Sequence, residues 1–303
     1  MDSGRGQPSP SQKTKASEAK RLMISVLIRT LNEQINLPHC LESLSWCDDI
    51  VVLDSGSTDQ TVQIAEQAGC RVIERRFSDE SAQLNWASTQ IEYKHPWVYC
   101  SDADEVLPSD LVGEMKSIAL DTTNTNVAYR LRYKNYFMDR WIKHCGIYPV
   151  WVLRFYRPEM VRWERIVNCT PVVQGSIGEL KGHFHHYSFR KGLAAWVDKH
   201  NKYSTNEAIE SLRSLRQRKV PWTEIFQWKD PSLRRLALKE LSFRLPCRGF
   251  LRFVYMYLFK AGFLDGVPGY HYCRLLSIYE YLIALKISEI RQQELQGGQG
   301  VER

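Results

Sequence analysis

The sequence predicts an α/β protein built on a mostly parallel sheet with helices on both faces. Two short apolar runs, residues 23–29 (MISVLIR) and 50–53 (IVVL), are rich in β-branched residues and end in turn-forming residues, as buried strands do. Between them, apolar residues recur at the spacing of one helix face, namely Leu37, Cys40, Leu41 and Leu44. Strand, helix and strand in succession predict a β-α-β unit, because parallel strands need a crossover connection.

The same alternation continues to about residue 120. Thr58 or Asp59 is expected to cap a second helix, which Gly69 ends. The remaining elements expected in this part are a strand at 71–74, a helix at 78–90 and a strand at 97–100 (WVYC). Ligands of such sheets bind at the carboxyl ends of the strands, so we expect any site to lie there.

The chain is expected to divide into four segments. These are a disordered tail at 1–22, the α/β domain at 23–190, a helical region at 191–292 and a frayed tail at 293–303. Within the α/β domain, residues 127–188 lose the alternation and become aromatic-rich and strand-like. Within the helical region, helices are expected from Lys191, over 232–260 and over 270–290.

Composition indicates a reducing, intracellular environment. The eight cysteines form no CxxC pair or zinc spacing, which predicts free thiols. No apolar stretch resembling a secretory signal precedes Met23, so a cytoplasmic location is expected. The net charge is +7, and it is concentrated at 229–260, where eight Lys and Arg residues face only Asp230 and Glu240.

The basic segment predicts contact with an anionic membrane surface. Residues 251–266 (LRFVYMYLFKAGFLDG) are apolar and aromatic, but charges interrupt them too often for a membrane span. Aromatic side chains beside basic ones are typical of a helix lying in the membrane interface. A packed helix with solvated charges remains an alternative. Nucleic-acid binding would rest on charge alone, since no recognised module is present, and no nucleic-acid partner is expected.

Three polar clusters each follow an apolar strand, at 30–33 (TLNE), 54–59 (DSGSTD) and 101–105 (SDADE). Parallel strands end at one edge of a sheet, so these clusters are expected to converge. If residues 102–104 are extended, the carboxylates of Asp102 and Asp104 point the same way. At ~4 Å two like charges repel by roughly 4 kcal/mol at an effective dielectric near 20, which favours a divalent cation or a shared proton.

Mg²⁺ or Mn²⁺ is the cation expected here, because such ions combine one or two protein carboxylates with water and substrate phosphates. The ligand implied is a diphosphate. Two plainer interpretations stay open. A DxD triplet can arise by chance, and Asp54 can serve as an Asx-turn or helix-capping residue.

Several stretches resemble glycosyltransferase family 2, which has the GT-A fold: VLIRTLNEQINLPHCLESL, DDIVVLDSGSTDQTVQIAEQAG, AQLNWA and DADEVLP. Closer similarity is to the lipopolysaccharide-core and exopolysaccharide β-glycosyltransferases, through residues 135–137 (NYF), 186–188 (HYS), 201–205 (NKYST) and 259–266. The resemblance implies inverting transfer of a sugar from a nucleotide-diphosphate-sugar donor to a glycan or lipid-linked acceptor. A peripheral position on the inner face of the membrane would suit such an acceptor.

The resemblance also implies roles for individual residues. Thr30, Asn32 and Glu33 would line the nucleotide pocket, and Asp54 would bind the base edge. Asp102 and Asp104 would hold the metal and the diphosphate. Gln83 and Asn85 match the donor-contacting QxN helix of the family.

The general base is where the sequence departs from its relatives, which carry a His-Glu pair after an apolar Val. Here Asn168 and Cys169 follow Val167, and neither is a good proton acceptor. Glu164 and His186 are the candidates we retain, and His186 could instead complete the metal shell. Other nearby candidates are Asp139, His144, His183 and His185.

Two further functional classes remain open. One is a nucleotide-sugar-binding protein with altered or lost catalysis, which the Asn168-Cys169 departure suggests. The other is a nucleotidyltransferase, which the missing glycine-rich phosphate loop disfavours.

Overall fold

The computed structural model describes residues 24–164, 169–217 and 247–298. The expected tail at 1–22 and the part of the basic segment before residue 247 lie outside these ranges. The chain divides into two compact units. The first comprises Met1–Tyr133 and Val150–His186, and the second comprises Lys134–Pro149 and Tyr187–Arg303. Residues 134–149 thus group with the helical region, although the sequence pattern suggested that they belong to the α/β domain.

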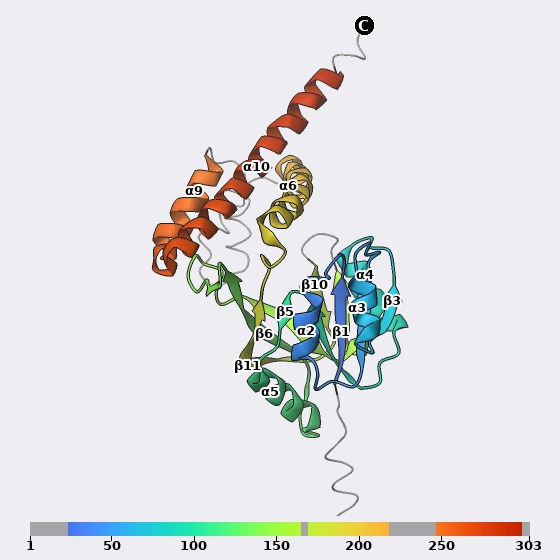
Figure 1. Ribbon diagram of the computed structural model, residues 1–303. Coiled ribbons are helices and arrows are strands. Elements are labelled where there is room, and N and C mark those ends of the chain that lie inside the picture. The colour runs from blue at the N-terminus through green and yellow to red at the C-terminus, as the bar shows by residue number, and fades with distance from the viewer. Residues whose placement is uncertain (1–23, 165–168, 218–246, 299–303) are drawn as a thin grey trace, which may run out of the picture. The chain divides into compact units, whose positions relative to one another are not determined.

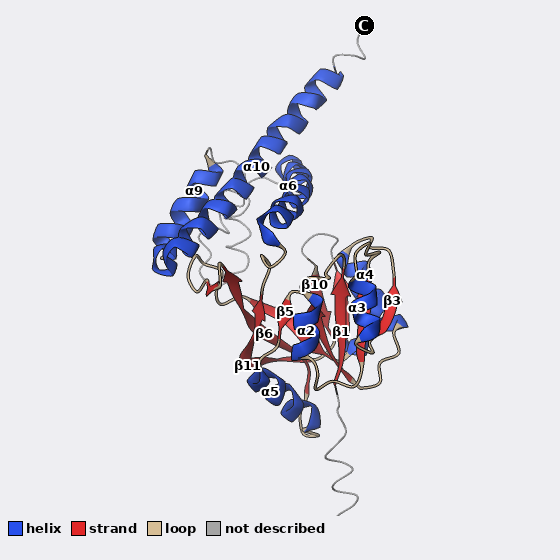
Figure 2. Ribbon diagram, in the orientation of Figure 1, coloured by secondary structure: helices blue, strands red, loops and turns tan. Residues whose placement is uncertain are grey.

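One mixed sheet forms the centre of the first unit (Figures 1 and 2). Its strands run in the order β3-β2-β1-β4-β8-β6-β11-β5. The parallel part consists of β1 (Ile24–Thr30), β2 (Ile50–Asp54), β3 (Arg71–Glu74) and β4 (Trp97–Asp102). All four strands expected from the apolar runs are confirmed, and β1 lies between β2 and β4.

The aromatic-rich stretch supplies the antiparallel part of the sheet, as its strand-like pattern predicted. Its strands are β6 (Asn126–Phe137), β8 (Trp151–Tyr156) and β11 (Ser176–His186), and the short β5 (Glu105–Val106) pairs with the end of β11. A separate two-stranded ribbon joins β9 (Val161–Glu164) to β10 (Thr170–Val173), after the 3₁₀ turn η1 (Pro158–Met160).

Helices cover both faces of this sheet, because buried side chains alternate along its strands. On one face, α2 (Leu37–Ser43), α3 (Thr61–Gln67) and α5 (Ser109–Leu120) share a core with Val26, Ile28 and Tyr99. On the other face, α4 (Glu80–Gln90) packs on Leu27, Leu53 and Val98. The sheet is therefore the middle layer of three.

Aspartate carboxylates accept backbone N–H groups at the start of two helices, although the N-cap residue of α3 is Gln60 and neither Thr58 nor Asp59. The Asp59 carboxylate accepts the backbone N–H of Thr61 at 3.0 Å, at the first residue of α3. Asp79 caps α4 by accepting the N–H of Ala82 at 2.8 Å. Gly69, with φ of 75°, follows the end of α3 as expected.

The second unit is mainly helical. Its elements are β7 (Arg140–Trp141), α6 (Gly192–Gln217), α9 (Arg248–Val254), the π-helix η2 (Tyr255–Phe259), the 3₁₀ helix η3 (Gly262–Asp265) and α10 (Gly266–Gly298). Helix α10 continues to Gly298, so the frayed tail expected from residue 293 is wrong for residues 293–298. The unbroken run of helix-forming residues from Ile290 to Leu295 accounts for the extension.

Two small cores hold the second unit together. One gathers Phe137, Ile142, Cys145, Tyr272 and Cys273 around Met256. The other joins α6 to α10 through Ala208, Leu212, Ile283 and Ile287. All eight cysteines are free, as predicted. Within the described ranges, none of the helices has an apolar stretch that could cross a bilayer.

Candidate functional site

The three polar clusters meet at the carboxyl end of β1. In the strand register, Thr30 lies opposite Asp54 on β2, and Arg29 lies opposite Asp102 on β4. Since neighbouring strands are about 4.8 Å apart, the backbones of Asp54 and Asp102 are separated by roughly 10 Å. The convergence that the sequence predicted is confirmed.

Asp54 organises the turn after β2. It is fully buried, and its Oδ1 accepts the hydroxyls of Thr30 at 2.7 Å and Ser57 at 2.6 Å. Its Oδ2 accepts the backbone N–H groups of Gly56 at 2.9 Å and Ser57 at 2.7 Å. Four acceptor positions of one carboxylate are thereby filled. The Asx-turn interpretation describes this geometry, which leaves little capacity for direct contact with a base.

The loops after β1 and β2 are joined by hydrogen bonds into one rim. Asn32, with φ of 55°, accepts the N–H of Thr58 through its Oδ1 at 2.8 Å, and its own N–H donates to Ser57 Oγ at 2.7 Å. The N–H of Glu33 donates to Thr61 Oγ1 at 2.7 Å. Asn32 and Glu33 thus lie on the rim, as expected, while Thr30 lies buried beneath it.

The two polar residues of α4 have different surroundings. Gln83 is buried and donates through Nε2 to Ser55 Oγ at 3.1 Å, so it lies beside the end of β2. Asn85 instead pairs with β9. Its Nδ2 donates to the carbonyl oxygen of Trp163 at 2.8 Å, and its Oδ1 accepts the Trp163 N–H at 2.8 Å. Gln83 supports the site, whereas the amide of Asn85 is engaged in holding the ribbon.

Asp102 lies between two arginines. Its Oδ1 accepts Nε and Nη2 of Arg29 at 2.9 and 2.5 Å, and its Oδ2 accepts Nη2 of Arg154 at 2.5 Å. Burial alone would raise the pKa of Asp102, but the charges of Arg154 and Arg29 outweigh it and hold that pKa well below its usual range. Asp102 therefore stays ionised and is neutralised by guanidinium groups.

Glu105 shares Arg154 with Asp102. Nη2 of Arg154 reaches Glu105 Oε1 at 2.5 Å, and the Glu105 side chain is almost fully buried. Burial raises the pKa of Glu105 to about 7, against the opposing charge of Arg154. The Asp102–Arg154–Glu105 chain, extended by Arg29, forms a buried ionic network beneath the rim.

Asp104 has a different partner from Asp102. Residues 103–104 form a turn between β4 and β5, so the extended geometry expected for Asp102 and Asp104 is wrong. Alternation along a strand cannot place both carboxylates on one side once the strand has ended. Asp104 Oδ2 instead lies 3.3 Å from Nε2 of His186, at the end of β11.

His186 is brought to Asp104 by strand pairing, since it lies opposite Glu105 in the β5–β11 register. Burial lowers the pKa of His186, but the carboxylates of Asp104, Glu105 and Asp102 outweigh it, and the pKa is raised. Its buried Nδ1 has no hydrogen-bond partner among the described residues. In the same described part of the chain, no three His, Cys, Asp or Glu side chains are grouped closely enough to enclose a metal by themselves.

The candidates for a general base are dispersed. Glu164 ends β9, is about half exposed and pairs with Arg162. Asn168 lies outside the described residues. His183 and His185 lie on β11. Asp139 and His144 belong to the second unit, where His144 Nδ1 lies 2.8 Å from Asp265 Oδ1.

Sequence reasoning missed the roles of Arg29, Arg154 and Glu105. A signal was present, because Arg29 and Arg154 each interrupt an apolar strand, in VLIRT and VWVLRFY. A charge inside a buried strand requires a counter-charge. What the sequence cannot show is which carboxylate supplies it, because the partners are separated by 73 and 52 residues.

Comparison with known proteins then settles the family. The model of "Glycosyl transferase family 2" matches residues 25–178, from the second residue of β1 to the third residue of β11. The chain belongs to glycosyltransferase family 2. It is accordingly a glycosyltransferase with a GT-A-type fold, as the resemblance implied.

Relatives in this family extend the similarity beyond the matched domain. An uncharacterized glycosyltransferase of Rickettsia bellii is 26% identical over 92% of this chain and 90% of its own length. The lipopolysaccharide core biosynthesis glycosyltransferase LpsC of Rhizobium meliloti is 29% identical over 64% of this chain and 73% of its own. A solved structure of glucosyl-3-phosphoglycerate synthase from Mycobacterium tuberculosis aligns with a TM-score of 0.33 and 23% identity, over 44% of this chain and 51% of that chain.

Proposed function

We propose that this glycosyltransferase moves a sugar, with inversion, from a nucleotide-diphosphate-sugar to a glycan or lipid-linked acceptor. The observation that carries the proposal is the Asp104–His186 pair at the carboxyl edge of the sheet, beside the rim formed by the loops after β1 and β2. Nucleotides bind at this edge in open α/β sheets. The backbone and side-chain donors of the rim would hold the nucleoside, and the pair would face the diphosphate.

Asp104 and His186 are the residues that fit a divalent metal. A carboxylate and an imidazole can coordinate a metal together, and the unpartnered Nδ1 of the buried His186 is available to a further group. Asp102 does not fit as a ligand in this conformation, because both of its oxygens already accept from guanidinium groups. Mg²⁺ or Mn²⁺ held there, with water and phosphate oxygens completing its shell, would stabilise the negative charge of the leaving diphosphate.

Glu164 is the general base that we propose. An inverting transfer needs a group that takes the proton of the acceptor hydroxyl as this hydroxyl attacks the anomeric carbon. Glu164 is an accessible carboxylate at the end of a strand that α4 contacts through Asn85 and Trp163. His186 is less suited, because its Nε2 is already engaged by Asp104.

We further propose that the acceptor belongs to cell-envelope polysaccharide, in the lipopolysaccharide core or an exopolysaccharide. The similarity to LpsC supports this suggestion, since that relative is named for lipopolysaccharide core biosynthesis. The second unit offers a surface suited to such an acceptor. Large apolar side chains around η2 and η3 are strongly exposed, with Phe259 at 78%, Phe250 and Val267 at 64% and Leu258 at 57%. We call these four residues the apolar tip.

The apolar tip supports a peripheral position at the cytoplasmic face of an anionic membrane. Arg252 and Lys260 lie in the same segment, and exposed apolar and basic side chains together suit the membrane interface. Several strongly exposed large apolar side chains in one segment suit an interaction site better than an ordinary packed helix. The exposure favours the interfacial interpretation of residues 251–266 over the packed one.

The decisive experiment is a panel of nucleotide sugars offered to the purified protein with Mg²⁺, Mn²⁺ or EDTA. We expect metal-dependent release of nucleoside diphosphate from one donor, and an inverted anomeric configuration in the product by NMR. Donor binding with no release from any donor, even with acceptor glycolipids present, would favour a binding protein that has lost catalysis. Steeply salt-dependent affinity for oligonucleotides would favour the basic nucleic-acid-binding alternative.

A further inference from the structure

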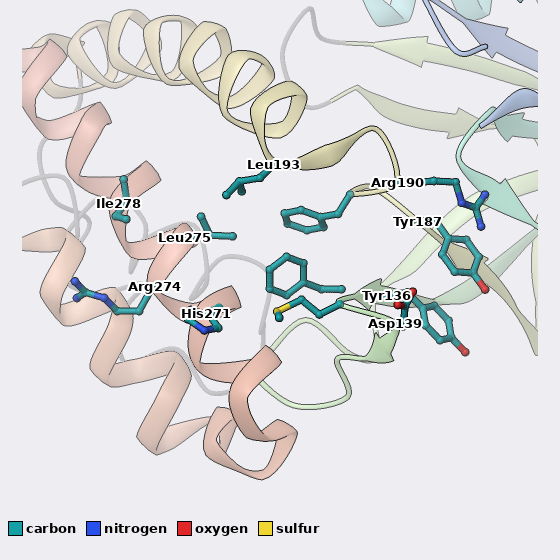
Figure 3. Close-up of a pocket in the computed structure, with 12 residues that line it drawn as sticks. Tyr136, Asp139, Tyr187, Arg190, Leu193, His271, Arg274, Leu275 and Ile278 are labelled. Atoms are coloured by element: carbon teal, nitrogen blue, oxygen red, sulfur yellow. The ribbon is translucent and has the colours of Figure 1, made fainter. Parts of the chain in front are cut away.

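The second unit contains a pocket that the sugar-transfer site does not use. Its volume is about 680 Å³, within the usual range for small-molecule sites. Side chains from the end of β6, from the segment 187–193 and from α10 line it (Figure 3). All of the lining residues lie within the second unit, so the pocket is a property of that unit alone.

Three of the apolar side chains that line the pocket are open to solvent, and together they are called its aliphatic wall. Met138, Leu193 and Ile278 line it, and their exposed fractions are 56%, 54% and 47%. Fully burying one such side chain stabilises a protein by about 1.5–3 kcal/mol. Three exposed side chains around one cavity therefore lack a stabilisation that burial would provide. An apolar ligand lying on this wall would recover that stabilisation.

The polar groups of the pocket include two arginines. Arg190, Arg274 and His271 line it, with Asp139 as the acidic lining residue. The guanidinium of Arg190 lies 4.2 Å over the ring of Tyr187, and its buried Nη1 has no hydrogen-bond partner in the described ranges. A buried guanidinium donor left without an acceptor is costly, and a phosphate or carboxylate would satisfy it.

Aromatic rings fix the position of this cation. Tyr187 stacks on Tyr136 with ring centroids 4.9 Å apart, and Figure 3 shows Arg190 above that pair, on one side of the aliphatic residues Leu193, Leu275 and Ile278. The pocket thus combines an aliphatic wall with a positioned cationic group. This pairing matches a molecule with a hydrocarbon chain and an anionic head.

We infer that the pocket binds an anionic amphiphile and holds the phosphorylated lipid part of the acceptor. The hydrocarbon would lie on Leu193, Ile278 and Met138, and the phosphate would accept hydrogen bonds from Arg190. The role of this pocket in holding the acceptor rests on the proposed sugar transfer, but the binding of an anionic amphiphile does not. The two ideas can therefore be tested separately.

Binding is tested by titration calorimetry of the full chain, without donor or metal, using octyl phosphate below its micelle concentration. Octyl glucoside supplies the same chain with a neutral head, and inorganic phosphate supplies the head alone. We expect octyl phosphate to bind about tenfold more tightly than either, since a charge-assisted hydrogen bond is worth roughly that factor. Equal affinities for the two octyl compounds, or inorganic phosphate binding as tightly as octyl phosphate, would overturn the inference.

Matched variants locate the site. Ile278→Glu should weaken both octyl compounds at least tenfold, because the octyl chain would have to cover and desolvate the new carboxylate. Ile209→Glu, an exposed isoleucine of α6 outside the pocket, is the control and should change neither affinity. Arg190→Gln should abolish only the preference for phosphate, and Arg190→Lys should partly restore it. If Ile278→Glu and Ile209→Glu behave alike, the site is elsewhere.

The acceptor role has its own readout. In the active enzyme, Ile278→Glu should raise KM for a lipid-linked acceptor while donor hydrolysis without acceptor stays unchanged. An unchanged KM would remove the acceptor role from this pocket and leave the proposed sugar transfer intact. Conversely, if no donor reacts, the proposed function is refuted, while the measured affinity for octyl phosphate stays the same.

Discussion

Nε2 of His186 lies 3.3 Å from Oδ2 of Asp104, although 82 residues separate the two along the chain. The antiparallel pairing of β11 with β5 creates this proximity, since His186 lies opposite Glu105. The pair therefore depends on strand register, and a change in either residue should act on the site more than on the core.

Asp104→Asn and His186→Ala should each weaken metal-dependent binding of nucleoside diphosphate by about tenfold or more, because each removes one contact to the metal. Calorimetry with UDP, or with the diphosphate of the active donor, in Mn²⁺ and in EDTA would measure the change. Asp110→Asn, an exposed aspartate of α5, is the matched control. Full metal-dependent affinity in both site variants would refute this metal assignment.

Arg154→Leu should lower the free energy of unfolding by about 3–5 kcal/mol, because it leaves the buried Glu105 without its cation and the part-buried Asp102 with Arg29 alone. Arg162→Leu is the comparison, since Arg162 pairs with Glu164 on the surface, and it should cost less than about 1 kcal/mol. Urea denaturation of both variants would measure the difference. Similar losses for the two would show that the buried network contributes little to stability.

Asp54→Asn should reduce stability by about 1–3 kcal/mol, because its amide nitrogen cannot accept the hydrogen bonds that one carboxylate oxygen now accepts. Ser57→Ala removes one hydroxyl donor to Asp54 and the acceptor of the Asn32 N–H, but it leaves the other three hydrogen bonds of the carboxylate, so it should be milder. Thermal unfolding with and without nucleotide would measure both changes. If Asp54→Asn keeps full stability but loses nucleotide binding, the residue contacts the base directly and the turn-forming role is secondary.

Asp79→Ala should cost about 1 kcal/mol at neutral pH through loss of the cap on α4. The N–H of Ala82 and the hydroxyl of Ser81 lower the pKa of Asp79 in the folded state. A lowered folded pKa means that this stabilisation is present above the unfolded pKa and is lost as pH falls through the folded value. Asp79→Asn should keep the cap without this pH dependence. Unfolding curves between pH 3 and pH 7 for the three proteins would test it.

Phe259→Ser with Leu258→Ser should reduce binding to anionic vesicles at least tenfold, since both side chains belong to the apolar tip. Flotation with vesicles of phosphatidylglycerol and phosphatidylcholine, compared with phosphatidylcholine alone, would measure it. Phe77→Ser removes a phenylalanine of the first unit that is about as exposed as Leu258, at 56%, and should change nothing. If the wild-type protein does not float with anionic vesicles at low salt, the membrane proposal is contradicted.

Local patterns made much of the first unit predictable. β1, β2 and β4 are apolar runs that end in turn residues, and their parallel pairing follows from the helices between them. The edge at which Thr30, Asp54 and Asp102 meet follows from the same topology. The motifs along residues 23–120 were sufficient to predict the family without any knowledge of side-chain contacts.

Long-range pairing was not predictable. Nothing in the sequence links Arg154 to Asp102 or His186 to Asp104, because these contacts depend on the register of β8 and β11 in the sheet. The grouping of 134–149 with the helical region depends on similar contacts, such as Asn135 with Tyr272 and Cys145 with Cys273. The turn at 103–104 was missed because β4 ends two residues earlier than an extended DxD would require.

The position of β1 between β2 and β4 has an evolutionary consequence. The loops that follow β1, β2 and β4 all leave the sheet at its carboxyl edge, outside the core that the strands and helices form. Loops at this edge can change in length and composition while the interior stays intact, which allows one scaffold to diversify toward new donors.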